Sequence, residues 1–133
     1  MYLHDWAGED GFRSMVFDFE GCSYGASSEC DAALRDEKYQ GINVLLASYT
    51  YQDYSGSAFV LFERGGQLFE VHGSHCSCYG LEDQWTPEEV TLESLWHRLD
   101  KGELGKSYNG NEFVNELRDV LSQYESSCDI AKR

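Results

Sequence analysis

Residues 58–72 read AFVLFERGGQLFEVH, and this stretch decides the fold. Two segments rich in β-branched and aromatic residues flank Gly65-Gly66. Glycines accept the positive φ angles that a two-residue type I′ turn requires. The sequence therefore predicts a β-hairpin in which Arg64 pairs with Gln67.

The register of this hairpin sorts its side chains into two faces, because side chains alternate across a strand. One face is apolar and is expected to lie in the core, with Phe62 opposite Phe69 and Val60 opposite Val71. The other face mixes apolar and acidic groups, so it is either covered by a helix or exposed to a partner. Its pairs are Phe59 with His72, Leu61 with Glu70, and Glu63 with Leu68.

The segments before the hairpin predict further strands and one helix. Residues 42–51 read INVLLASYTY, a β-rich stretch that residues 53–57 follow as a turn. Residues 15–19 read MVFDF and are predicted to form a short strand, whereas the glycine-rich residues 1–26 are otherwise expected to be irregular. Ser27 or Ser28 is predicted to cap a helix that runs to about Tyr39.

Two amphipathic helices are predicted after the hairpin. Residues 86–89 read TPEE, which supplies an N-cap hydroxyl, a proline at the first position and a capping-box glutamate for a helix ending at Gly102. A second helix is predicted from near Asn109. Their apolar stripes are Leu92, Leu95, Trp96 and Leu99, and then Phe113, Val114, Leu117, Val120, Leu121 and Tyr124.

These elements together predict one α+β domain over residues 1–133. Its small antiparallel sheet consists of the central hairpin 58–72 and the strand 42–51. The sheet is expected to pack against two or three amphipathic helices.

Charge limits the class of partner. The chain has 24 acidic and 10 basic residues among 133, a formal net charge of -14. Such a chain repels nucleic acid and anionic lipid and attracts basic protein surfaces, so we expect no direct nucleic-acid or membrane partner. Residues 1–6 lack the features of a secretory leader, no apolar run approaches the ~18 residues of a membrane span, and the five cysteines are odd in number. We therefore expect a cytoplasmic protein with reduced thiols.

Acidic and aromatic residues are the candidate contact groups for a basic partner. Tyr49 and Tyr51 occupy alternate positions of the predicted strand and so share a face, although tyrosines on a half-buried strand explain the same pattern. The candidate contact residues are Asp5, Glu9, Asp10, Glu29, Asp31, Asp36, Glu37, Tyr49, Tyr51, Asp53, Tyr54, Glu82 and Asp83.

A second candidate site follows the hairpin, where His72, His75, Cys76 and Cys78 fall within seven residues. Zinc accepts these ligand atoms, but adjacent His and Cys with a Cys-x-Cys are not the usual spacing, so packing of a tight turn is favoured over metal binding. No cofactor is therefore expected, with zinc as the alternative. More distant zinc ligands would be Cys22 and Cys30.

The same cluster has an enzymatic interpretation. Cys76 or Cys78 would be the nucleophile, and His72, His75 or His97 would be its base. No sequence feature supplies an orienting acid or an oxyanion donor, so we favour a protein that is not an enzyme.

Residues 48–63 read SYTYQDYSGSAFVLFE and residues 68–82 read LFEVHGSHCSCYGLE, followed by QW at 84–85 and PEE at 87–89. This block resembles a family of small phage and prophage proteins of unknown function, and its most specific part is GSHCSCYG at 73–80. The resemblance implies a viral or mobile-element origin. Small acidic proteins from that source include inhibitors of host machinery such as DNA mimics and anti-CRISPR proteins.

Charge and resemblance together predict a phage-derived acidic inhibitor. Its partner would be a basic host protein, of the kind found as a nucleic-acid-binding component of a defence complex. The alternatives are a small zinc-binding module built on His72, His75, Cys76 and Cys78, and a thiol-dependent enzyme.

Overall fold

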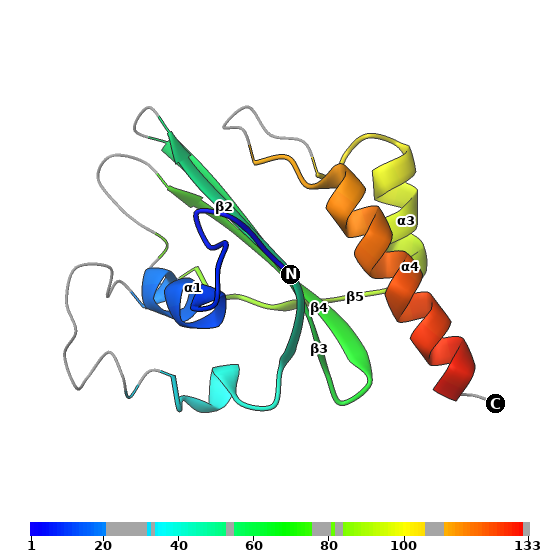
Figure 1. Ribbon diagram of the computed structural model, residues 1–133, viewed down its shortest axis with the longest axis horizontal. Helices are drawn as coiled ribbons and strands as arrows, with labels where there is room; N and C mark the ends of the chain where they lie inside the picture. Colours follow the sequence, from blue (N-terminus) through cyan, green and yellow to red (C-terminus); the bar gives the residue numbers. More distant parts are fainter. Residues whose placement is uncertain are drawn as a thin grey trace.

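The computed structural model describes residues 1–20, 32, 34–52, 55–75, 81, 84–105 and 111–131 (Figure 1). Its described part is built on one five-stranded sheet in the order β1-β2-β3-β4-β5. The strands are β1 (Tyr2–His4), β2 (Asn43–Gln52), β3 (Ser55–Arg64), β4 (Gln67–His75) and β5 (Glu88–Val90). The helices are α1 (Gly11–Phe19), the short 3-10 helix η1 (Glu37–Tyr39), α3 (Leu92–Asp100) and α4 (Val114–Ala131).

The predicted hairpin is confirmed together with its register. β3 pairs antiparallel with β4, and Arg64 lies opposite Gln67. Gly65 and Gly66 have φ angles of 61° and 83°, which are the left-handed values of a type I′ turn. The predicted strand 42–51 is also confirmed, because β2 spans Asn43–Gln52 and pairs antiparallel with β3.

The α+β class is confirmed, but the sheet is mixed rather than antiparallel. β2 to β5 form an antiparallel meander, whereas β1 pairs parallel with β2. The reason is the route of the chain, which passes through α1 before it enters β2. A strand that returns to the same sheet through such a crossover runs parallel to the first.

Helices cover both faces of the sheet, so both hairpin faces are buried. Figure 1 shows α1 on one side of the sheet and α3 with α4 on the other. On the α1 side, Phe62 and Val71 pack with Trp6 and Phe19. On the side of α3 and α4, the mixed face of the hairpin is covered by a helix pair. That second core contains Leu46, Phe59, Leu61, Leu68, Leu95, Leu99, Phe113, Leu117 and Leu121.

The strand predicted at residues 15–19 is wrong, because this segment is the end of α1. The buried residues Met15, Val16 and Phe19 have helical spacing, but a short apolar run of this length does not distinguish a strand from a helix. Helix α1 also lies close to β1. A side chain at Gly11 would collide with the ring of Tyr2, so the glycine permits this approach.

The helix start predicted at residues 86–89 is also wrong. Glu88–Val90 forms β5, which pairs with Leu68–Glu70 of β4. Helix α3 begins only at Leu92, where the Thr91 side chain accepts a hydrogen bond from the Ser94 N–H at 3.1 Å. Two threonines compete as N-caps in this sequence, and pairing with the edge of β4 favours the second. The predicted apolar stripe is confirmed, because Leu95 and Leu99 are buried.

Two other helix boundaries differ from the prediction. Helix α4 begins at Val114 rather than near Asn109, which lies outside the described residues. Residues 34–36 form turns and bends before η1, so a continuous helix to Tyr39 is wrong. Its predicted start at Ser27 or Ser28 lies outside the described residues. Among the helices that are described, none combines the length and the apolarity needed to cross a membrane.

Side chains bond to backbone groups of β2 and β4 beyond the points where the short edge strands β1 and β5 stop pairing. On β4, the Gln84 amide accepts from the Ser74 N–H and donates to the Ser74 carbonyl, both at 2.8 Å. On β2, the Asp5 carboxylate accepts from the Tyr51 N–H at 3.1 Å. Satisfied edges resist pairing with another chain. The segment around Gln84 therefore runs alongside β4, and this arrangement forms the candidate site.

Candidate functional site

A buried carboxylate on β4 organises the candidate site. Glu70 lies on the side of the sheet that faces α3 and α4, and it is only 7% exposed. The guanidinium of Arg98 from α3 binds it in a two-pronged ion pair, with Nη1 at 3.0 Å from Oε1 and Nη2 bonded to Oε2. Nε2 of His72, two residues along β4, lies 2.9 Å from Oε1. The three side chains form one charged network between the sheet and α3.

The network keeps Glu70 ionised. Burial alone raises the pKa of this carboxyl, but the hydrogen bonds and charges of His72 and Arg98 outweigh burial and lower the pKa to about 2. An ionised carboxylate can only accept hydrogen bonds. Nε2 of His72 is therefore the protonated nitrogen, and when the ring is neutral its Nδ1 is a free acceptor. Glu70 thus fixes both the orientation and the tautomer of His72.

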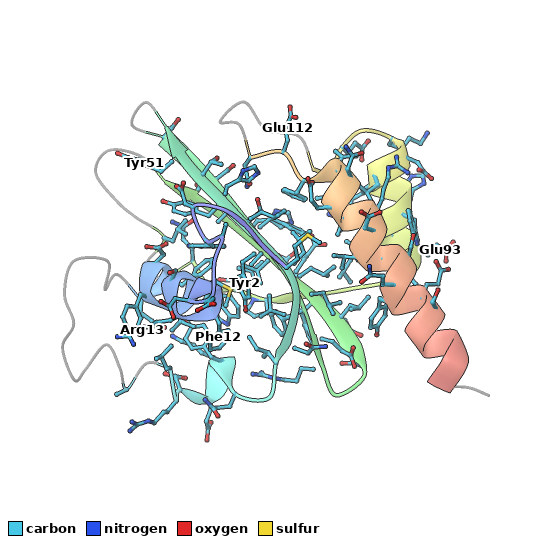
Figure 2. The ribbon with its side chains drawn as sticks, viewed as in Figure 1. Tyr2, Phe12, Arg13, Tyr51, Glu93 and Glu112 are labelled. Atoms are coloured by element: carbon cyan, nitrogen blue, oxygen red, sulfur yellow. The ribbon has the colours of Figure 1, made fainter. Side chains whose placement is uncertain are left out.

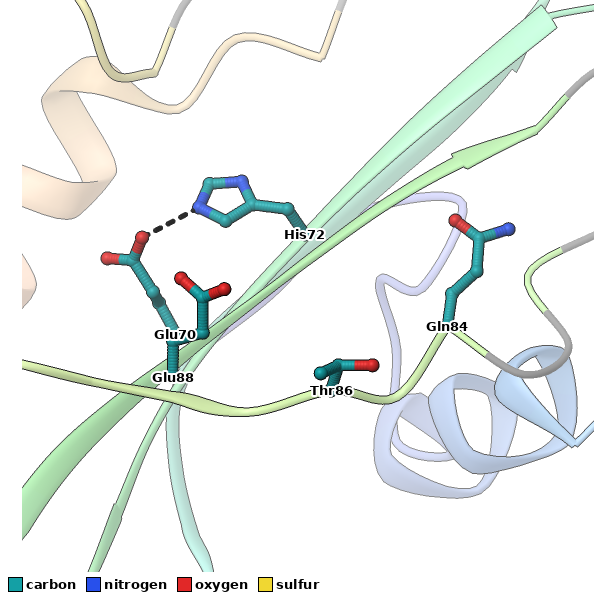
Figure 3. Close-up of a pocket in the computed structure, with 5 residues that line it drawn as sticks. All are labelled: Glu70, His72, Gln84, Thr86 and Glu88. Atoms are coloured by element: carbon teal, nitrogen blue, oxygen red, sulfur yellow. Dashed lines mark hydrogen bonds and ion pairs between the residues drawn. The ribbon is translucent and has the colours of Figure 1, made fainter.

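A cavity of about 280 Å³ adjoins this network. It is lined by Glu70 and His72 from β4 and by Gln84, Thr86 and Glu88 from the adjacent segment (Figure 3). Glu88 is the cross-strand partner of Glu70, and the pairing of β5 with β4 extends no further in this direction. The cavity therefore lies where β4 and the segment 84–88 run side by side without continuous backbone pairing.

A second cavity, of about 200 Å³, shares His72 with the first. Its other walls include Phe59, Glu103, Phe113 and Asn111. The Asn111 side chain is buried and donates to the Ser57 carbonyl at 3.1 Å, and it is hydrogen-bonded to the Ser48 hydroxyl. This contact holds the segment before α4 against the sheet. The side chain of His72 is 52% exposed and lines both cavities.

The predicted aromatic contacts separate into a buried and an exposed residue. Tyr49 is only 7% exposed because its ring stacks on Trp6, with 5.1 Å between ring centroids. It therefore belongs to the core and not to a contact surface. Tyr51 is 42% exposed at the end of β2 (Figure 2). Asp53 and Tyr54 lie outside the described residues.

The predicted acidic contacts are exposed wherever the structure describes them. Asp5, Glu9, Asp10, Asp36 and Glu37 all lie at the surface. Two of them also have a local role, because Asp5 caps β2 and Asp36 accepts from the Lys38 N–H. The others, Glu29, Asp31, Glu82 and Asp83, lie outside the described residues.

Most of the predicted zinc or thiol cluster lies outside the described residues. This holds for Cys76, Cys78 and the side chain of His75, and also for Cys22 and Cys30. Within the described ranges, no three His, Cys, Asp or Glu side chains are grouped so that they could hold a metal ion. His97 is exposed on α3 and makes no contact with the network. Zinc binding therefore stays a prediction.

Sequence reasoning missed Glu70, Arg98 and Glu88 as members of a site. The signal for Glu70 was present, because the predicted register places this acid opposite Leu61, on the face that also carries Phe59 and Leu68. A carboxylate at such a position needs a cation to be buried. The partner Arg98 becomes identifiable only when the helix is placed over the sheet.

Several of the chain's few cations are engaged by acceptors of the chain itself. Arg98 and Arg118 pair with Glu70 and Asp100, and Arg64 donates to three backbone carbonyls. Many exposed carboxylates, in contrast, have no hydrogen-bond or ion-pair partner among the described residues (Figure 2). They are those of Glu9, Asp10, Glu37, Glu88, Glu89, Glu93, Glu103, Glu112, Asp119 and Glu125.

Comparison with known proteins adds no family to this description. No protein-family model matches the chain, and searches of curated proteins and of solved structures also give no match.

Proposed function

We propose that this chain is a phage-derived acidic inhibitor that binds a basic, nucleic-acid-binding protein in the host cytoplasm. The observation that carries the proposal is the imbalance at the surface. Many exposed carboxylates have no partner among the described residues, whereas Arg64, Arg98 and Arg118 are engaged by acceptors of the chain itself. The phage-like block at residues 48–89 supports the viral origin.

The physical basis is competition for a polyanion site. Proteins that bind nucleic acid present lysine and arginine to phosphates, and most of their affinity comes from these contacts. A folded protein that carries unpaired carboxylates offers the same sign of charge on a rigid surface. It also approaches such a partner quickly, because complementary fields steer the encounter. Binding of this kind blocks nucleic acid by occupying the same cations.

The test is capture from a bacterial lysate with the chain as bait, at about 0.05 M and about 0.2 M salt, where the Debye length falls to ~8 Å or less. We expect one basic protein that double-stranded DNA releases from the bait and that is lost at the higher salt. Release by DNA is the decisive part, because it shows that both ligands use one surface. A captured protein that DNA does not displace would contradict the proposal.

A matched pair of bait variants separates charge from shape. One variant neutralises carboxylates around α4 with Glu112→Gln, Asp119→Asn and Glu125→Gln. The control variant changes exposed neutral residues of the same helix with Asn115→Ala, Ser122→Ala and Gln123→Ala. We expect at least tenfold less capture by the first bait and unchanged capture by the control, whereas equal capture by both would rule out a charge-driven interface on this helix.

The Glu70–His72 hydrogen bond favours a thiol-dependent enzyme as a second candidate. A histidine that a buried carboxylate orients is what a general base requires. Under this hypothesis, Cys76 or Cys78 reacts with iodoacetamide at neutral pH much faster than the other cysteines, and His72→Asn removes the difference. Uniformly slow labelling of all five cysteines would exclude it.

A further inference from the structure

The cavity beside Glu70 has the size and the walls of a site for one side chain. Its volume is about 280 Å³, and its described walls combine carboxylates, an imidazole, a hydroxyl and an amide (Figure 3). Among the residues that the structure describes, no lysine or arginine lines it. The cavity therefore offers hydrogen-bond acceptors and negative charge, and it lacks a cation that would bind an anion.

The charge that is free for a ligand belongs to Glu88. Glu70 is already paired, because Arg98 binds both of its oxygens and His72 shares one of them. Glu88 lies directly across from Glu70 on β5, is exposed, and has no partner among the described residues. Two carboxylates at opposed positions repel each other, which a cation bound at Glu88 would relieve. Glu70 lines the cavity, but its charge is neutralised by Arg98. The carboxylate that can attract a cationic ligand is therefore that of Glu88.

The remaining walls suit a flat donor with several N–H groups. The Gln84 amide is already used by the Ser74 backbone, so it closes one end of the cavity. Thr86 and His72 also line the cavity, and a hydroxyl oxygen or an imidazole nitrogen can accept a hydrogen bond. A guanidinium group presents five donors in a plane, whereas an ammonium group is a compact point charge. The acceptors on these walls therefore favour arginine over lysine.

We propose that this cavity binds an arginine side chain of the basic partner, with the Glu88 carboxylate as its ion-pair acceptor and with Thr86 and His72 as neutral acceptors. The inference rests on the proposed function and gives it a defined anchor. Interfaces commonly owe much of their affinity to a few such residues, and arginine is prominent among them.

The test uses Nα-acetyl-arginine methylamide as the probe and ¹H–¹⁵N NMR as the readout. The citrulline counterpart is the ligand control, because it has nearly the same shape without the charge. Glu88→Gln is the test variant. Glu89→Gln is its matched control, since this residue carries the same charge on the same strand but pairs with Phe69, one position along the register and so on the other face of the sheet.

We expect saturable shifts of the amides of His72, Thr86 and Glu88 with the arginine probe and none with the citrulline probe. Glu88→Gln should weaken the binding of the arginine probe at least about tenfold, and Glu89→Gln should change it less than about twofold. Equal weakening by both variants would overturn the inference, because it would show diffuse attraction rather than a site. Equal binding of the citrulline probe would overturn it as well.

The same variants distinguish this inference from the proposed function. If Glu88→Gln leaves capture of the DNA-displaced protein unchanged, the cavity is not the anchor although the proposed function stands. If the arginine probe binds at Glu88 but no captured protein is displaced by DNA, the proposed function fails although the cavity site is real. Glu88 is exposed, so the variant is expected to fold, and an unchanged thermal midpoint verifies this.

Discussion

Replacing Arg98 with methionine tests whether the Glu70 network organises the site. Methionine keeps most of the volume and the apolar stem of arginine but removes both bonds to the carboxylate. Glu70 would then stay buried with His72 as its only partner. Burial, which acts to raise its pKa, would then be opposed by His72 alone. The variant therefore leaves a buried carboxylate without its guanidinium partner beneath α3.

The magnitude follows from the burial of the pair. Removing one partner of a buried ion pair costs about 3–5 kcal/mol in the free energy of unfolding. The side chains of Arg98 and Glu70 are 26% and 9% exposed, so we expect a loss near the lower end, about 3 kcal/mol. Arg118→Met is the control, because its pair with Asp100 joins side chains that are 43% and 68% exposed at 3.4 Å. An exposed pair of this kind contributes about 0–1 kcal/mol.

The assay is urea unfolding of both variants at neutral pH and at pH 5. The double variant Glu70→Leu with Arg98→Met should recover most of the loss, because replacing both charges by apolar groups removes the uncompensated carboxylate. The difference between wild type and Arg98→Met should also narrow at pH 5, because losing Arg98 raises the pKa of Glu70 and brings the carboxylate closer to protonation. A loss for Arg98→Met no greater than that for Arg118→Met would refute this description of the network.

Three further predictions concern the fold. Because the pKa of Glu70 is lowered from 4.5 to about 2, its ionisation adds about 3 kcal/mol to the free energy of unfolding above pH 4.5. Urea unfolding at a series of pH values should show this contribution lost as the pH falls towards 2. The Glu70→Gln variant should not show the loss. Leu117→Ala should lower the free energy of unfolding by about 2–5 kcal/mol in the same assay, because Leu117 is fully buried under the sheet. Gly105→Ala should lower the melting temperature, since φ is 90° and a Cβ would lie 2.7 Å from Cγ2 of Val114. An unchanged melting temperature would contradict this.

The central hairpin was predictable because its signals are local and agree with one another. The glycine pair specifies the turn, the turn specifies the register, and the register specifies both faces. The apolar stripes of α3 and α4 were predictable for a similar reason, since Leu95, Leu99 and Leu117 recur at helical spacing. Short periodic signals therefore sufficed for the parts of the fold that bury most side chains.

The misassigned elements depend on contacts that are distant in the sequence. β5 is a strand because the free edge of β4 lies beside it, although residues 86–89 carry the chemistry of a helix start. β1 joins the sheet by parallel pairing with β2. Its three residues are too few for the sequence to predict a strand there. Likewise, the short apolar run at 15–19 does not distinguish a strand from the last turns of α1.

The candidate site was predictable only in part. His72 was identified through its cysteine and histidine neighbours, and Glu88 was interpreted as part of a helix cap. Their juxtaposition with Glu70 and Arg98 requires both the register of β5 and the placement of α3. A charge network of this kind depends on tertiary contacts. The sequence therefore shows which charged residues are present but not which of them pair.

The direct test of an acidic inhibitor is the dissociation constant of the wild-type chain for the captured basic protein. It is measured at about 0.05 M and about 0.2 M salt, with and without double-stranded DNA. We expect binding to weaken at least about tenfold at the higher salt, and we expect DNA to compete with the chain. A dissociation constant that neither salt nor DNA changes would contradict an acidic inhibitor that occupies a nucleic-acid site.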